Sequence, residues 1–367
     1  MILSDAMDAV LEKLSETVRA ASRSKRALRL RGGGTKDFYG NALEGEVLDT
    51  RGYSGIVTYE PSELVITARC GTRLAATESA MRERGQMLAF EPPHFAQFGS
   101  GFGSGATLGG VIAAGLSGPR RQAAGALRDF VLGVKIMDGR GDVLAFGGQV
   151  MKNVAGYDVS RLMAGSLGTL GIILDVSLKA LPRPAAEATL RLELPEDKAI
   201  EQLNRWGGKP LPIGASAWTG GELAVRLSGA AAAVAAAQKQ IGGELVEPEQ
   251  GERFWTGIRE QTDPFFRNDA PLWRISVPST TPPLKLPGEP LIEWGGALRW
   301  LCSRADARTV RDAAKRARGH ATLFRGGDKS VGVFQPLAPA LMKIHKELKR
   351  EFDPQGVFNR GRMYPEL

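Results

Sequence analysis

The sequence predicts an α+β protein with more than one domain, and three observations support this expectation. Strand-like and helix-like segments follow one another over the first hundred residues. After residue 184, strands with alternating apolar and polar residues appear again. The composition changes at the run Leu181-Pro182-Arg183-Pro184, which is the clearest boundary in the chain. A chain of 367 residues is also long for one hydrophobic core, so we expect two domains, or one domain with a large insertion.

Before this boundary, apolar periodicity and turn residues predict a series of short elements. An amphipathic helix is expected near the N-terminus, where Val10, Leu11, Leu14 and Val18 form one apolar stripe. The other expected elements are strands at 27–30, 55–60, 63–68 and 87–90, a helix at 72–84, a hairpin of 130–138 with 143–146, and a long strand at 170–180.

After the boundary, the sequence predicts strands combined with helices. Strands are expected at 189–194 and 222–227, followed by an alanine-rich helix at 230–241 and a proline-dense loop at 278–290. A final helix at 339–352 carries Leu341, Ile344 and Leu348 at helical spacing.

Net charge and cysteine content narrow the class of protein. The formal net charge of +8 suits an anionic ligand, an acidic protein partner or a membrane surface. The basic residues are dispersed and are not interleaved with aromatic ones, which argues against nucleic acid as a partner. Cys70 and Cys302 lie far apart and form no CxxC motif, which excludes a disulfide scaffold and a cysteine-ligated zinc or iron–sulfur site. Without a signal-peptide segment or a long apolar run, the chain is expected to be cytoplasmic, and peripheral association with the inner face of the membrane is left open.

The glycines are concentrated between residues 31 and 171, in three loops that suit a ligand with linked phosphates. Such a ligand needs many backbone N–H donors at close range, and glycine allows this approach because it has no Cβ. The loops are 31–36, 103–110 and 165–171. Each loop alone is also compatible with a tight turn, but three of them in one domain favour a shared ligand. Neither the Rossmann glycine spacing nor a GxxxxGK[ST] motif is present.

The same loops resemble those of a known family. The runs Arg-Gly-Gly-Gly-Thr-Lys at 31–36, Ala-Thr-Leu-Gly-Gly at 106–110 and Gly-Ser-Leu-Gly-Thr-Leu-Gly at 165–171 are similar to the FAD domain of the vanillyl-alcohol oxidase / p-cresol methylhydroxylase (PCMH) family. The closing run 352–362 resembles that family's C-terminal segment. More narrowly, segments 92–95, 118–121, 151–158 and 319–323 resemble the flavin subunits of bacterial glycolate oxidase. The match runs over nearly the whole chain, densely up to residue 184 and after residue 319.

This resemblance implies a PCMH-type FAD-binding domain of two α/β subdomains at 1–183, a cap domain with an antiparallel sheet at 184–335, and a C-terminal segment at 336–367 that returns to the FAD domain. It also implies that the first loop holds the pyrophosphate, the second contacts pyrophosphate and flavin, and the third lies along the adenosine half. The implied cofactor-binding residues are Arg31, Gly32, Gly33, Gly34, Thr35, Lys36, Tyr39, Gly40, Gly103, Ser104, Gly105, Ala106, Thr107, Gly109, Gly110, Ser117, Gly165, Gly168, Thr169, Gly171, Ile172, Ile173 and Asn359.

FAD is expected to be bound non-covalently. Some relatives attach the flavin through a histidine in the first loop or a cysteine in the second. This chain has Lys36 in the first neighbourhood and no cysteine between Cys70 and Cys302.

The resemblance further implies FAD-dependent oxidation of a CH–OH donor, which needs a base for the hydroxyl proton and a cation for a substrate carboxylate. Similar 2-hydroxy-acid dehydrogenases bind a metal through a histidine run, but this chain has only His94, His320 and His345, so no metal site is expected. We take His320 and Arg325 as the catalytic candidates. His94 is expected to stabilise its loop, and His345 is expected near the surface.

Other polar residues near the loops have more than one interpretation. Lys152 and Asn153 suit the isoalloxazine rim, Tyr157 and Asp158 suit orientation of the flavin-side loop, and the Arg120-Arg121 pair suits phosphate, a partner or plain solvation.

Three functional hypotheses stay open. The first is an FAD-binding subunit of a glycolate oxidase (glycolate dehydrogenase) complex that oxidises glycolate to glyoxylate. It would act beside a homologous flavin subunit and an iron–sulfur subunit through which the electrons leave, in keeping with the lack of cluster-ligating cysteines here. The second is a stand-alone flavin dehydrogenase or oxidase for another small 2-hydroxy acid or alcohol. The third is a non-catalytic, flavin-holding assembly subunit.

Overall fold

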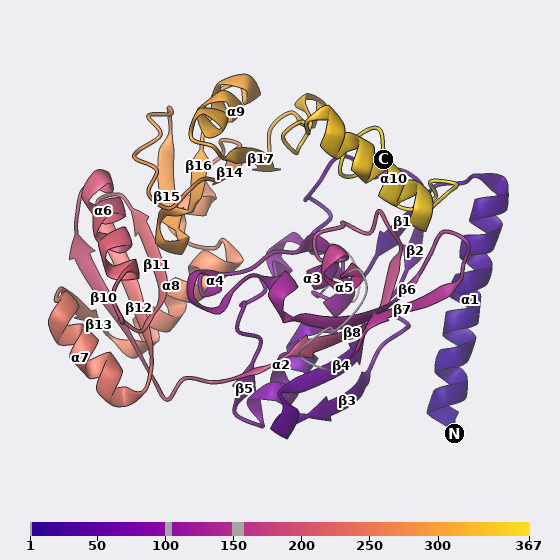
Figure 1. Cartoon of the computed structure of the whole chain (residues 1–367), viewed down its shortest axis with the longest axis horizontal. Coiled ribbons are helices and arrows are strands. Elements are labelled where there is room, and N and C mark those ends of the chain that lie inside the picture. The colour runs from indigo at the N-terminus through magenta and orange to yellow at the C-terminus, as the bar shows by residue number, and fades with distance from the viewer. Residues whose placement is uncertain (1, 100–104, 149–157) are drawn as a thin grey trace.

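The structure, a computed structural model, describes residues 2–99, 105–148 and 158–367. Figure 1 shows two sheet-based halves side by side, an N-terminal half around a five-stranded sheet and a second half around an eight-stranded sheet. This mixture of helices and antiparallel sheets confirms the expected α+β class. Within the described ranges, no helix has the length and apolar character needed to cross a membrane.

The five-stranded sheet has the order β3-β4-β8-β6-β7, and each neighbouring pair is antiparallel. Its strands are β3 (Ile56–Glu60), β4 (Val65–Arg69), β6 (Val131–Met137), β7 (Val143–Gly147) and β8 (Ile172–Lys179). The central strand β8 is buried along nearly its whole length. Helices α2 (Leu74–Arg82) and α3 (Leu108–Ala114) pack on the sheet, where Leu74, Leu108 and Ile112 share one core with Ile66 and Val176.

A separate parallel pair, β1 (Leu28–Arg31) and β2 (Glu46–Asp49), lies beside this sheet. Helix α1 (Ile2–Ser24) covers it, since Leu14 and Val18 pack with Leu28 and Leu174. The C-terminal segment returns to the same place: Leu28 donates its N–H to the carbonyl of Val357 at 2.7 Å and pairs in parallel with Phe358. The N-terminal half is therefore completed by residues from the far end of the chain.

The eight-stranded sheet has the order β13-β10-β12-β11-β15-β16-β14-β17, and its register is antiparallel throughout. Its strands are β10 (Ala186–Glu193), β11 (Ile213–Thr219), β12 (Glu222–Gly229), β13 (Glu244–Val246), β14 (Leu272–Ser276), β15 (Glu289–Glu293), β16 (Leu298–Cys302) and β17 (His320–Arg325). All of them fall within the range 184–335 of the expected cap domain, whose exact boundaries stay a prediction.

Three helices cover one face of the eight-stranded sheet, which we call the outer face. These are α6 (Glu196–Gly207), α7 (Ala231–Ile241) and α9 (Ala307–Arg316), whose apolar residues share cores with Leu223, Ile275 and Leu323 of the strands. The opposite, inner face meets the N-terminal half. There Leu272, Trp300 and Phe324 pack with Tyr39 and with residues of the glycine-rich segments such as Leu167. Helix α8 (Pro248–Glu260) also lies on the inner face, where Trp255 packs on alanines of β11 and β12.

Most elements expected from the sequence are confirmed to within about two residues, including α2, the β6–β7 hairpin, β8 and α7. The strand expected at 87–90 is wrong: β5 covers only Gln86–Met87 and pairs with the two-residue β9 (Leu181–Pro182). Pro182 limits that ladder, and Leu88, Ala89 and Phe90 instead fill the core.

The final helix, α10 (Pro339–Phe352), forms as expected, but its apolar stripe is not buried. Leu341 and Ile344 are about half exposed, at 50% and 51% of their surface, and only Leu348 packs partly against the core. The helix is held to the protein mainly from its other end, through Lys349 and Phe352.

Candidate functional site

The three glycine-rich segments converge on one cleft of the N-terminal half, which we call the glycine cleft. It is lined by Leu30, Arg31, Gly32, Gly33, Gly34, Thr35, Lys36, Asp37, Thr50, Thr107, Gly109, Gly110, Ala113, Ala114, Leu167, Gly168, Gly171, Ile172, Ile173, Asn359 and Arg362. Fourteen of the cofactor-binding residues expected from the sequence are among them, drawn from all three loops and the C-terminal segment. Loops from three separate parts of the N-terminal half therefore line one cleft.

Glycine is required where the first loop touches the second. A Cβ on Gly33 would overlap the carbonyl oxygen of Gly105, and a Cβ on Gly32 would overlap the hydroxyl of Thr107. The two loops thus lie backbone against backbone, which leaves their amides free of side-chain cover toward the cleft. Thr107 also caps α3, because its hydroxyl accepts a hydrogen bond from the amide of Gly110.

Asn359 ties the first strand to the third loop. Its Oδ1 accepts from the amide of Leu30 at 2.8 Å, and its Nδ2 donates to the carbonyl of Leu167 at 2.7 Å. The side chain is buried and lies in the cleft lining. Asn359 therefore sets the width of the cleft, which gives it a positioning role whether or not it touches a ligand.

Two buried cations, Lys36 and Arg362, give the glycine cleft its electrostatic character. Among the described residues, Lys36 Nζ donates to two neutral acceptors, Thr35 Oγ1 at 3.2 Å and the carbonyl of His94 at 3.4 Å. Burial lowers the pKa of Lys36 to about 8, although the charge of Glu260 acts in the opposite direction. Arg362 donates to the carbonyls of Lys36 and Tyr39 at 3.0 and 2.8 Å, and burial lowers its pKa to about 10.

Neither of these two cations forms an ion pair with a carboxylate among the residues that the structure describes, whereas Arg31 pairs with Asp37 at 2.8 Å. A buried cation without a counter-ion is costly, and an anion in the cleft removes that cost. A dianionic pyrophosphate held by glycine amides between Lys36 and Arg362 fits this donor set.

The other expected cofactor residues support the loops from behind. They are Tyr39, Gly40, Gly105, Ala106, Ser117, Gly165 and Thr169, and none of them is part of the cleft lining. Tyr39 packs against Phe324 of β17, with ring centroids 5.1 Å apart. Ser117 accepts from the amide of Leu127, and Thr169 bonds within its own loop to Ser166. Gly103 and Ser104 lie outside the described residues, as do Lys152, Asn153 and Tyr157.

The two catalytic candidates do not converge. His320 and Arg325 stand at opposite ends of β17, beside Ser276 and Leu272 respectively. Arg325 is already engaged, donating to Gln261 Oε1 at 2.6 Å and to the carbonyl of Phe266 at 3.1 Å while it stacks on Phe98. His320 lies on the edge strand β17 with much of its surface exposed; partial desolvation of its ring, followed by the charge of Arg274, lowers its pKa. A joint acid/base and carboxylate pair is thus not formed, and a catalytic role for either residue stays a prediction.

The remaining candidates have structural partners. His94 Nε2 lies 2.9 Å from Glu78 Oε2, and its amide donates to Glu260. His345 stays near the surface beside Tyr364. Asp158 caps the short helix α5 (Val159–Leu162). Across the described ranges, no group of three potential metal ligands is found.

The inner face carries polar residues that sequence reasoning missed. The sheet register puts Glu293, Ser276 and His320 in one row across β15, β14 and β17, and puts Trp300, Arg274 and Thr322 in the next row. All six side chains point to the same face because strand residues alternate. An arginine within the apolar strand Leu272-Trp273-Arg274-Ile275 was the available signal, since a charge on a buried strand needs a reason.

Arg274 and Arg121 form a pair of like charges around one ring. Their guanidinium carbons lie 5.3 and 4.3 Å from the ring centroid of Trp294. Burial and the charge of Arg274 both lower the pKa of Arg121. Within the part of the chain that the structure describes, neither arginine reaches a carboxylate at ion-pair distance. Two close guanidinium groups that form no ion pair suit a small carboxylate.

Glu293 is the buried acid next to this pair. Its Oε2 accepts from Trp300 Nε1 at 2.7 Å, while Oε1 has no hydrogen-bond partner among the residues that the structure describes. Burial raises the pKa of Glu293 to about 7, despite the opposing hydrogen bond from Trp300 and the charge of Arg274. A carboxyl that changes protonation near neutrality, with one free oxygen, has the properties of a proton acceptor.

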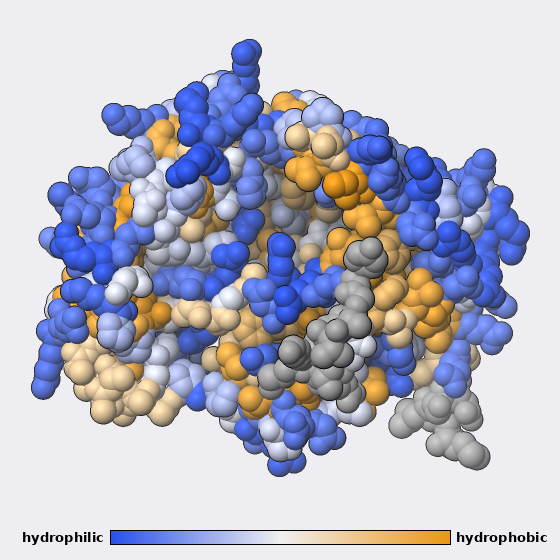
Figure 2. All heavy atoms as spheres, in the orientation of Figure 1, coloured by the Kyte–Doolittle hydropathy of each residue, from blue (hydrophilic) through white to orange (hydrophobic). Residues whose placement is uncertain are grey.

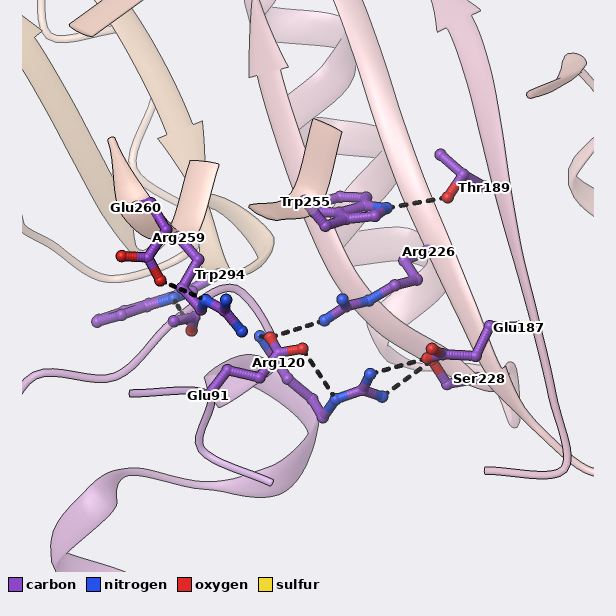
Figure 3. A network of polar contacts seen from close by, with 11 residues as sticks. Glu91, Arg120, Glu187, Thr189, Arg226, Ser228, Trp255, Arg259, Glu260 and Trp294 are labelled. Carbon is purple, nitrogen blue, oxygen red and sulfur yellow. Dashed lines mark hydrogen bonds and ion pairs between the residues drawn. The ribbon is translucent and has the colours of Figure 1, made fainter. Parts of the chain in front are cut away.

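A buried ion-pair network holds the inner face against the N-terminal half (Figure 3). Arg226 donates to Glu91 Oε2 at 2.8 Å and stacks on Trp255. Arg120 donates to Glu187 Oε1 at 2.8 Å and to Ser228 Oγ at 3.0 Å, and its amide donates to Glu91. Burial opposes ionisation of Glu91, yet the charges of Arg226 and Arg120 keep its pKa below the usual range. Arg120 is thus not a solvated residue, and its fixed position places the neighbouring Arg121 over Trp294.

Comparison with known proteins agrees with this cleft. Residues 10–147 match a family model described as an FAD binding domain. In the solved structures, an alkyldihydroxyacetonephosphate synthase shares the fold, with a TM-score of 0.66, 13% identity, and coverage of 95% of this chain and 75% of that one. The chain is therefore an FAD-dependent oxidoreductase with a PCMH-type FAD-binding fold, and FAD is its cofactor.

Sequence relatives narrow the class further. The glycolate oxidase subunit GlcE of Escherichia coli (strain K12) is 48% identical over 356 residues, covering 97% of this chain and 98% of that protein. The chain belongs to the family of this GlcE subunit. Partial matches include a D-2-hydroxyglutarate dehydrogenase of Xanthomonas citri pv. viticola, 30% identical over 55% of this chain and 41% of the relative. The glycolate oxidase subunit GlcD of Bacillus subtilis (strain 168) is 42% identical over 23% of this chain and 18% of the relative.

Proposed function

We propose that this chain is the FAD-binding subunit of a glycolate oxidase complex and takes part in the oxidation of glycolate to glyoxylate. Membership of the GlcE family supports the assignment to such a complex. The observation that supports the substrate proposal is the arginine pair Arg121–Arg274 at Trp294, which forms no ion pair among the described residues and suits a small carboxylate. Arg274 lies on the sheet face that packs against the glycine-rich loops, and Arg121 reaches the same Trp294 ring from the short helix α4 (Arg121–Ala124).

For the cofactor, we assign the pyrophosphate to the amides of the first two loops, with Lys36 and Arg362 as its counter-charges. Ile172 and Ile173 supply the apolar side along the adenosine half. Bound FAD supplies the two-electron acceptor for the reaction. Attachment is non-covalent in this proposal, because the described lining contains no cysteine or histidine. Yellow colour that stays in the pellet after acid precipitation would contradict this.

For the substrate, Arg274 and Arg121 bind and orient the glycolate carboxylate. Glu293 accepts the hydroxyl proton through its free Oε1, while Trp300 holds the other oxygen and keeps the carboxyl facing the site. His320, in the same row of the sheet, is the alternative proton acceptor. Glycolate loses two electrons and two protons on becoming glyoxylate: the base takes the hydroxyl proton, and the carbon-bound hydrogen would leave with both electrons as a hydride, for which bound FAD is the acceptor.

The electrons leave through an iron–sulfur subunit, and a homologous flavin subunit is the third member of the complex. The chain has only two cysteines, Cys70 and Cys302, and both are buried and distant in sequence, so it contributes no cysteine-ligated cluster of its own. We place the protein in the cytoplasm, with any membrane contact made through these partners.

Anaerobic titration with glycolate tests the function. The purified chain should contain FAD, and glycolate should bleach its 450 nm band in the assembled complex. Bleaching of the isolated chain would show that it oxidises glycolate without its partners. The flavin of this chain could also stay oxidised, both in the isolated chain and in a complex whose other flavin subunit has been inactivated. In that case this chain holds flavin but does not oxidise glycolate.

A further inference from the structure

The excess positive charge of the chain is concentrated in one segment. Residues 304–352 contain 12 lysines and arginines and 5 acidic residues, a net charge of +7, whereas the other 318 residues carry only +1. This segment forms α9, β17 and α10, which follow one edge of the molecule in Figure 1. Its exposed cations include Arg304, Arg308, Lys315, Arg316, Lys343 and Lys346. A local charge of this size steers an acidic partner by electrostatic attraction.

The same edge exposes apolar side chains. Leu341 and Ile344 stand three residues apart on one side of α10, and Val331, in the turn before it, is 45% exposed. Figure 2 shows apolar side chains gathered in the region of α10 with hydrophilic ones around them. An apolar centre with a charged rim is the composition of a protein interface. We call the outer sides of α9 and α10 and the turn 328–332 the basic face.

Hydrogen bonds join α9 to the turn 328–332, and join α10 to the third glycine-rich loop. Arg311 of α9 donates to the carbonyls of Val331 and Gly332. On the inner side of α10, Lys349 Nζ donates to the carbonyl of Thr169, in the third glycine-rich loop, at 2.7 Å. A partner on the outer side of α10 is thus separated from that loop by about 10 Å, the width of one helix.

We infer that the basic face is the docking surface for an acidic, electron-accepting partner, the iron–sulfur subunit of the complex. The inference rests on the proposed function, which requires such a partner. It explains why an amphipathic helix leaves half of its apolar stripe in solvent, and why the whole chain is basic although most of it is neutral.

A lipid surface suits these residues less well. Helices that lie in a membrane interface present a broad apolar side with Trp or Phe and a basic opposite side. No Phe, Tyr or Trp side chain of 304–352 is exposed, and Phe324 and Phe352 are buried. The remaining side of α10 is used up in packing on the protein, through Lys349 and Phe352.

The test compares two triple variants of the full-length chain. The test variant combines Lys343→Glu, Lys346→Glu and Leu341→Asp on the basic face. The control makes the same change in charge and polarity at the far end of the eight-stranded sheet, with Lys209→Glu, Lys239→Glu and Leu245→Asp, all at exposed positions. The Kd for the purified iron–sulfur subunit from the same genome is measured at two salt concentrations, together with flavin content as a check of folding.

The test variant should bind the iron–sulfur subunit at least about tenfold more weakly and lose its salt dependence, while the control stays within about twofold. Should the test variant fail to fold, Leu341→Ser with Ile344→Ser, which leaves every charge in place, should still weaken binding. Equal binding by test variant and wild type overturns the inference.

Two further outcomes are distinguishable. Suppose that wild type binds phosphatidylglycerol vesicles, and that the test variant loses this binding but still binds the iron–sulfur subunit. The basic face is then a membrane contact and the inference is wrong. If the wild-type complex assembles and oxidises glycolate and the test variant does the same, only the docking site is wrong. If wild type and iron–sulfur subunit do not associate at all, the proposed function fails with it.

Discussion

The glycine cleft and the inner face of the eight-stranded sheet meet in one hydrophobic core, but they present different kinds of groups to a ligand. In the cleft, three loops lie so close that recognition falls to the backbone, and Gly33 has no room for a Cβ. On the inner face, Arg274 and Glu293 are long side chains on separate strands, brought together only by the sheet register. A pyrophosphate needs many amides at close range, whereas a two-carbon acid needs a few charged side chains in the right orientation.

Gly33→Ala is expected to have the largest effect on the cleft side of this comparison. The new Cβ overlaps the carbonyl of Gly105, so the first two loops must separate, and the purified protein should retain less than about a tenth of its FAD. The ratio of flavin to protein absorbance measures this. Gly207→Ala, at a helical position with open space around it, is the matched control and should keep full FAD content. Normal FAD content in Gly33→Ala would show that the loops do not need backbone contact.

On the inner face, Arg274→Ala should leave the FAD content unchanged and strongly slow the reduction of the flavin by glycolate. Removal of one partly buried cation from a carboxylate costs roughly 4 kcal/mol, so the second-order rate constant for flavin reduction by glycolate should fall about a thousandfold. Arg205→Ala on the outside of α6, in an exposed ion pair, should change it by less than about twofold. Stopped-flow absorbance under anaerobic conditions gives both values. If the variant instead loses bound FAD and the remaining flavin is reduced at the wild-type rate, Arg274 contacts the cofactor and not the substrate.

Glu293→Gln should alter the pH dependence as well as the rate. Loss of the proton acceptor should slow flavin reduction by about a hundredfold or more, and should remove the rise in rate that wild type shows as pH passes through about 7. An unchanged pH profile in the variant would exclude Glu293 and leave His320 as the acceptor.

The same substitution has a consequence for stability. Folding raises the pKa of Glu293 from 4.5 to about 7, so the folded state favours the protonated acid. The contribution of this proton binding to the free energy of unfolding is fully present below about pH 4.5. It is lost as pH rises through 7, which lowers the free energy of unfolding by about 3 kcal/mol. Wild type should therefore lose thermal stability relative to Glu293→Gln between pH 5 and pH 8, as measured by Tm.

The contrast between the two regions also explains what could be predicted from the sequence. The cleft was predictable because its glycines stand in contiguous runs, and a missing Cβ has the same meaning in any fold. Arg274 and Glu293 were missed because they come together only through pairing of β14 and β15 with β16, which no local pattern reports. His320 and Arg325 were paired in the sequence analysis because they are close in the chain, but in a strand that closeness places them about 16 Å apart. The exposed stripe of α10 could not be foreseen either, since helical spacing identifies an apolar side but not what covers it.

Lys36→Met is the finest test of the cleft, because it removes a charge and keeps the shape. Burial lowers the pKa of Lys36 to about 8 in the chain without ligand, so its ammonium is poorly solvated and gains from a nearby phosphate. We expect the Kd for FAD to rise about tenfold in the variant, in line with the loss of one charge-assisted hydrogen bond.

The pH dependence of FAD binding separates a charge effect from a packing effect at Lys36. In wild type, FAD should bind more weakly as pH rises above 8, where the unliganded lysine loses its proton, whereas Lys36→Met should show no such slope. Fluorescence titration of apoprotein with FAD between pH 6.5 and 9.5 measures both curves. Parallel curves would mean that Lys36 only fills space and that Arg362 alone balances the charge of the pyrophosphate. Binding of FAD in the cleft would then depend on backbone amides even more strongly, in sharper contrast to the side chains of the inner face.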